Sequence, residues 1–139
     1  MADEHTSGGR EAGAAALGRL REVRHALLRL HKILLDDERG RYERRHGQVT
    51  GGELLQLVLN DAQFEWLRAI SELIVRIDET FEADEPPTHA DADELLAQTT
   101  RLLTPSESAA GFPGKYFAAL QREPAAVLAH REVKSLLKD

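Results

Sequence analysis

The sequence predicts an all-α protein, organised as a single-domain four-helix bundle with two long helices and a kinked or broken helical segment at its C-terminus. Helix-forming residues dominate the composition, whereas aromatic residues make up only 5% of the chain. Apolar residues recur at the three- and four-residue spacing of amphipathic helices. A chain of 139 residues is long enough for one core and too short for two. We therefore expect a flexible tail over residues 1–14 and one helical domain over residues 15–139.

The first expected helix covers residues 15–45 and ends near Gly47, because glycine suits the left-handed conformation that terminates many helices. Its inward stripe consists of Leu20, Val23, Leu27, Leu30 and Leu34. At about 100° per residue, the continuation of this stripe places Glu38 in the same direction as Leu20 and Leu27. A carboxylate on a core-facing line needs a partner, a proton, a metal or water.

The second expected helix begins at the capping-box pattern Thr50-x-x-Glu53 and reaches about Phe81. Asn60 and Asp61 interrupt it and mark either a kink or a new N-cap. Beside its main stripe, the helix carries further apolar residues at Leu57, Phe64, Leu67, Ile74 and Val75. A helix that is apolar on more than one side is either central to a bundle or part of a subunit interface.

The remaining helices are shorter. A second capping pattern, Thr88-x-x-Asp91, starts a helix that ends before Pro105. Residues 105–114 are expected to form a loop. A short helix through Gln121 should then be followed by a break and a final helix with Pro124 in its first turn.

Five short segments within about residues 30–78 together form a recognisable pattern. They are Leu30-His31-Lys32, Tyr42-Glu43, Leu54-Leu55-Gln56-Leu57, Trp66-Leu67-Arg68 and Ile77-Asp78. The pattern resembles a group of small, functionally uncharacterised bacterial all-helical proteins. The resemblance implies an all-helical bacterial protein. It supplies no activity, so no residue receives a catalytic role from it.

Composition and charge exclude several classes of function. The chain has no cysteine, which rules out disulfides, thiol catalysis and thiolate metal sites. A formal net charge of −6 disfavours general binding to nucleic acid, which depends on Lys and Arg meeting phosphates. We find neither a signal-peptide pattern nor an apolar run of membrane-spanning length. These features predict a cytoplasmic protein that does not insert into a membrane.

The leading functional hypothesis is a noncatalytic protein that acts through protein–protein interaction and associates with itself. It rests on the surplus apolar residues of the second helix, and the expected partner is a second copy or another protein. No catalytic residue is predicted, and the sequence identifies no cofactor.

An alternative hypothesis is a bundle that binds a metal, a cofactor or a small molecule, including oxidoreductases of that type. Bundles build such sites from inward side chains, and here the candidates are His31, Glu38 and Tyr42 on the first helix. The repeated Glu-x-x-His pattern of diiron bundles is absent. A purely structural interpretation is a buried polar network around Glu38.

A third hypothesis is an anion or nucleic-acid binder that uses the basic cluster of Arg39, Arg41, Arg44 and Arg45. The ordinary explanation of this cluster is that cations near a helix C-terminus complement the helix dipole.

Overall fold

The computed structural model describes the backbone of residues 2–138 and the side chains of residues 13–138. Its elements, in chain order, are α1 (Ala2–His46), α2 (Gly51–Asn60), the 3-10 helix η1 (Glu65–Leu67), α3 (Arg68–Glu82), α4 (His89–Leu102), α5 (Phe112–Arg122) and α6 (Pro124–Leu137). Over the described backbone there is no strand. The all-α prediction is confirmed.

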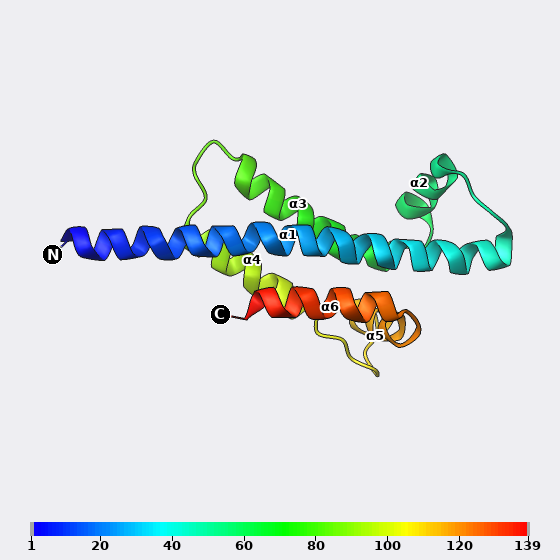
Figure 1. The fold of residues 1–139 in the computed structure, drawn as a ribbon. Helices are drawn as coiled ribbons and strands as arrows, with labels where there is room; N and C mark the ends of the chain where they lie inside the picture. Colours follow the sequence, from blue (N-terminus) through cyan, green and yellow to red (C-terminus); the bar gives the residue numbers. More distant parts are fainter. Residues whose placement is uncertain (1, 139) are drawn as a thin grey trace.

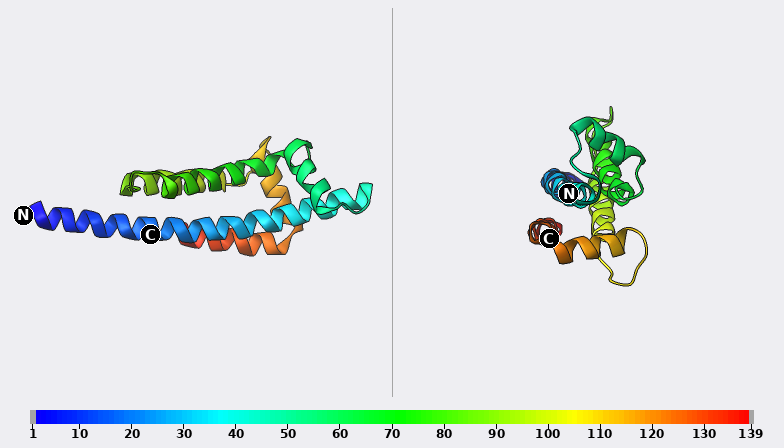
Figure 2. Two further views of the ribbon diagram at one scale, coloured as in Figure 1. Left: turned by 90° about the horizontal axis from the view of Figure 1, so that it is seen from above. Right: turned by 90° about the vertical axis from the view of Figure 1, so that its right-hand side faces the viewer.

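Helix α1 runs the length of the molecule, and the other helices are arranged along it (Figure 1). Helices α3 and α4 pack against each other and along one flank of α1, while α6 packs along another flank (Figure 2). Helix α5 lies between η1 and α6 and contacts both. Helix α2 stands near the C-terminal part of α1 (Figure 1).

The apolar stripe of α1 is buried as the sequence predicts. Leu20, Val23, Leu27, Leu30 and Leu34 are all fully buried. The helix ends at His46, and Gly47 follows with a φ of +86° while its N–H donates to the carbonyl of Glu43 at 2.8 Å. Because the side chains of residues 1–12 lie outside the described part, the flexible tail over residues 1–14 and the domain over residues 15–139 remain predictions.

The expectation of a second long helix is wrong, because the chain breaks it after Asn60 into α2 and then η1 with α3. At the break, Asp61 Oδ1 accepts the N–H of Gln63 at 2.8 Å, and the Asp61 carbonyl accepts the N–H of Phe64 at 3.1 Å. These local bonds compete with the helical ones, which is why Asp favours turns and caps. The turn directs Gln63 and Trp66 toward α1.

Both capping boxes are present, at Thr50 with Glu53 and at Thr88 with Asp91. The expected break near the C-terminus also occurs, with Pro124 as the first residue of α6.

Helix α5 begins at Phe112, inside the stretch predicted to be a loop. Its start follows Gly111, whose φ is +73°, and Pro113 occupies its first turn. Gly114, in the same turn, faces the carbonyl of Ala109 so closely that a Cβ at this position would clash with it.

The apolar residues predicted to form an interface are divided by the fold. Phe64, Leu67 and Ile74 are buried within this chain, Leu57 is partly buried against the core, and Val75 is exposed. Neighbouring helices of the same chain therefore cover three of the five. Within the described residues, no helix has the length and apolar character needed to span a membrane.

Candidate functional site

Glu38 lies on α1 one turn beyond Leu34 and is only 2% exposed. This agrees with the sequence prediction that its side chain faces the core. Burying a carboxylate without compensation is costly, so its surroundings decide whether it can stay ionised.

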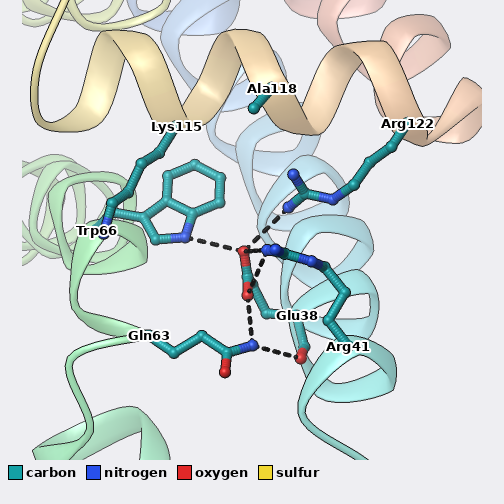
Figure 3. A pocket seen from close by; sticks show the side chains of 7 residues that line it. All are labelled: Glu38, Arg41, Gln63, Trp66, Lys115, Ala118 and Arg122. Carbon is teal, nitrogen blue, oxygen red and sulfur yellow. Dashed lines mark hydrogen bonds and ion pairs between the residues drawn. The ribbon is translucent and has the colours of Figure 1, made fainter. Parts of the chain in front are cut away.

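Four side chains donate hydrogen bonds to the Glu38 carboxylate (Figure 3). Gln63 Nε2 lies 2.8 Å from Oε2, Trp66 Nε1 lies 3.2 Å from Oε1, and Arg122 Nη2 lies 3.0 Å from Oε1. Arg41 Nη1 approaches both oxygens, at 3.2 and 3.3 Å. The donors come from α1, the turn before η1, η1 itself and α5. The hydrogen bonds of one carboxylate therefore connect four parts of the chain.

A pocket of about 290 Å³ opens beside this carboxylate. Its lining consists of Glu38, Arg41, Gln63, Trp66, Lys115, Ala118 and Arg122. Figure 3 shows the Arg41 and Arg122 guanidinium groups pointing toward Glu38, while Lys115 descends from α5 on the side of Trp66. Arg122 also donates through Nε to Asp37 at 2.7 Å. We call this cavity the Glu38 pocket.

The predicted trio of His31, Glu38 and Tyr42 does not converge. His31 is half-buried on α1 and is not part of the pocket lining, and burial lowers the pKa of its imidazole. Tyr42 lies against His46, with a ring separation of 4.3 Å, and faces Phe64 at 6.0 Å. Among the described residues, no three His, Asp or Glu side chains are grouped in a way that could hold a metal ion.

The predicted basic cluster is also divided. Arg39 donates to the carbonyl of Val49 at 2.7 Å and so fastens the loop after α1, whereas Arg41 reaches Glu38. Arg44 and Arg45 lie in the last turn of α1, as helix-dipole complementarity favours. Of the four arginines, only Arg41 belongs to the Glu38 pocket.

Sequence reasoning missed Gln63, Lys115 and Arg122 as site residues. Gln63 lies in the turn that breaks the expected long helix, and Arg122 is 84 positions from Glu38 along the chain. No periodicity or short motif relates residues at such a separation. The partial signal was Glu38 itself, whose predicted burial required donors from elsewhere.

A series of ring contacts extends from Trp66 to α6. The ring of Trp66 lies 5.6 Å from Phe112, Phe112 stacks on Tyr116 at 5.2 Å, and Tyr116 meets His130 at 5.4 Å. The Tyr116 hydroxyl and His130 Nδ1 are 2.6 Å apart, and burial raises the pKa of Tyr116. This series joins η1, α5 and α6 and holds Trp66 in place.

A second surface stands apart from the pocket. Helix α2 contains five large aliphatic residues and buries none of them fully. Leu54, Leu57 and Val58 pack partly against the core, whereas Leu55 and Leu59 are 56% and 55% exposed. Leu55 and Leu59 lie one turn apart and form what we call the α2 stripe.

No family model, curated protein or solved structure matches this chain.

Proposed function

We propose that this chain is a noncatalytic, cytosolic four-helix-bundle protein that works by protein–protein interaction and associates with itself through the α2 stripe. In this proposal α1, α3, α4 and α6 constitute the bundle, and α2 is its interaction element. The observation that carries the proposal is the exposure of Leu55 and Leu59 on a helix that contributes no fully buried residue to its own fold.

Such an exposed apolar helix costs hydration free energy unless it is covered. Fully burying a leucine contributes about 1.5–3 kcal/mol. The helix is nevertheless well formed, with the Thr50–Glu53 capping box at its start and the Asp61 N–H bonded to Leu57 at its end. A formed helix with an open apolar face is ready to be covered with little ordering cost.

Charge favours a second copy as the covering partner. Glu53 is the only charged residue of α2 and lies in its first turn, whereas Arg68 donates to the carbonyl of Leu59 at the opposite end, at 3.1 Å. An antiparallel pair of α2 helices related by a two-fold axis places Glu53 of one copy beside Arg68 of the other. The same arrangement opposes the two helix dipoles favourably and brings the two stripes together.

Sedimentation equilibrium over a wide concentration range tests the proposal. The expected result is a dimer, with a dissociation constant raised at least about 100-fold by Leu55→Lys together with Leu59→Lys. The matched control is Leu128→Lys on α6, because Leu128 is 66% exposed and lies on a different helix. A monomeric wild type, or equal weakening by the control, contradicts self-association through α2. If a different protein binds the monomer through α2, that protein takes the place of the second copy as the partner.

A second candidate function is small-molecule binding in the Glu38 pocket, and the observation that favours it is a cavity of about 290 Å³ beside a buried charge. Native mass spectrometry of untagged protein tests this candidate. Added mass that is lost on unfolding supports it, and a protein that takes up no small molecule from a fragment mixture contradicts it.

A further inference from the structure

We propose that the Glu38 pocket binds a small organic oxyanion and that Lys115 is the residue that anchors its charge. This inference rests on the second candidate function, small-molecule binding, and adds the chemical class of the ligand. Three properties of the pocket support it: its charge, the donors it leaves unused, and its apolar wall.

The charge around the pocket is positive in an otherwise acidic protein. Arg41 and Arg122 point toward Glu38, whereas Lys115 lines the same pocket on the side of Trp66 (Figure 3). Outside the lining, Arg122 also binds the carboxylate of Asp37 at 2.7 Å. Three cations against two carboxylates leave one positive charge in excess, although the whole chain has a formal net charge of −6. Glu38 does not repel a ligand strongly, because two guanidinium groups already compensate its charge.

The cations also have donors to spare. Within the described part of the chain, the Lys115 ammonium forms neither a hydrogen bond nor an ion pair. Arg122 uses Nε for Asp37 and Nη2 for Glu38, and Arg41 reaches Glu38 through Nη1 alone. Glu38 thus holds two guanidinium groups at the pocket while Lys115 is available to a ligand, and an oxyanion accepts charge-assisted bonds from such donors.

Apart from the charged groups and Gln63, the wall is apolar, and the space is small. The indole of Trp66 and the methyl group of Ala118 line the cavity beside the cations. A volume of about 290 Å³ lies at the lower end of the range for ligand pockets. The pocket therefore suits one anionic head with a short apolar body, such as a small carboxylate or phosphate ester.

Trp66 is the only tryptophan of the chain, so its fluorescence reports directly on the pocket. The experiment titrates the full chain with butyrate, with its neutral isostere butyramide, and with inorganic phosphate at constant ionic strength. We expect a saturable fluorescence change with butyrate and a much weaker response to butyramide. Saturation by phosphate as well identifies the bare oxyanion as sufficient. No saturable response to either anion overturns the proposal.

The variant Lys115→Met tests the anchoring residue, and Lys138→Met is its control because it removes the same charge from the far end of α6. Lys115→Met should weaken butyrate binding about tenfold, as expected for the loss of one charge-assisted bond. Circular dichroism checks that the fold is unchanged. Equal weakening by both variants overturns the role of Lys115. Equal binding of butyramide and butyrate overturns the oxyanion class but leaves small-molecule binding standing.

Discussion

The indole Nε1 of Trp66 donates a hydrogen bond of 3.2 Å to Oε1 of Glu38, joining η1 to α1 across a buried contact. Each group satisfies a requirement of the other, because a buried indole N–H needs an acceptor and a buried carboxylate needs donors. Among the described residues, no buried side-chain nitrogen or oxygen lacks a hydrogen-bond partner. The contact also fixes the position of the one aromatic ring that lines the Glu38 pocket.

Replacing Glu38 with alanine should therefore destabilise the fold by about 2–4 kcal/mol, because the buried donor of Trp66 loses its acceptor, Arg41 loses its carboxylate partner and Arg122 keeps only Asp37. Urea unfolding followed by circular dichroism measures the effect. The control is Glu94→Ala, since Glu94 is exposed and pairs with Arg101 at the surface. That change should cost less than about 1 kcal/mol. Similar costs for the two variants would show that the Glu38 network contributes no special stability.

Gly114→Ala should destabilise the protein by about 1–3 kcal/mol, because the added methyl group meets the carbonyl of Ala109. The neighbouring backbone has to shift to accommodate it, and backbone shifts more reluctantly than a flexible side chain. Gly18→Ala is the matched control, since nothing lies within 4 Å of a Cβ at that position in α1. There the change should stabilise by up to about 1 kcal/mol. The unfolding temperatures of the two variants should shift in opposite directions relative to the wild type. A shift of both temperatures in the same direction contradicts the steric argument.

The two capping boxes should differ in their effect on global stability. Thr88→Ala should lower the free energy of unfolding by about 1 kcal/mol, because α4 buries Ala92, Leu95, Leu96 and Thr99 in the core. Thr50→Ala should change it by less, because α2 buries no residue fully. Instead, amide hydrogen exchange within residues 51–60 should accelerate. The prediction fails if Thr50→Ala proves the more destabilising of the two.

Stability should fall as the pH drops from about 7 toward 5. Burial lowers the pKa of His31, and burial together with Lys134 lowers the pKa of His130. In the unfolded chain the histidine pKa is about 6.5, so these residues take up protons at a higher pH than they do in the folded chain. The free energy of unfolding therefore decreases as the pH falls below that value. Urea titrations at a series of pH values measure the slope, which His31→Gln together with His130→Gln should reduce. A wild-type stability that rises on acidification through this window contradicts the prediction.

Local patterns were sufficient for much of the fold. The stripe of α1, its end at Gly47, both capping boxes and the position of Pro124 depend on interactions within a few residues, which sequence spacing displays directly. The break at Asp61 was ambiguous because propensity and turn chemistry compete there, and the turn prevails with Gln63 directed to Glu38. Helix α5 begins at Phe112, earlier than expected, because Gly111 precedes it and Pro113 lies in its first turn, where proline is compatible with a helix.

By itself, the sequence determined that the chain is helical and that Glu38 faces inward, because both follow from the angular period of one helix. Only the tertiary structure decided which side chains meet that carboxylate. Gln63, Trp66 and Arg122 reach it because the path of the chain brings η1 and α5 to the same part of α1. Tertiary packing likewise buried Phe64, Leu67 and Ile74 and left Leu55 and Leu59 exposed. The spacing of apolar residues shows which face of a helix packs against the rest of the protein. Which segment packs against that face depends on contacts between residues far apart in the chain.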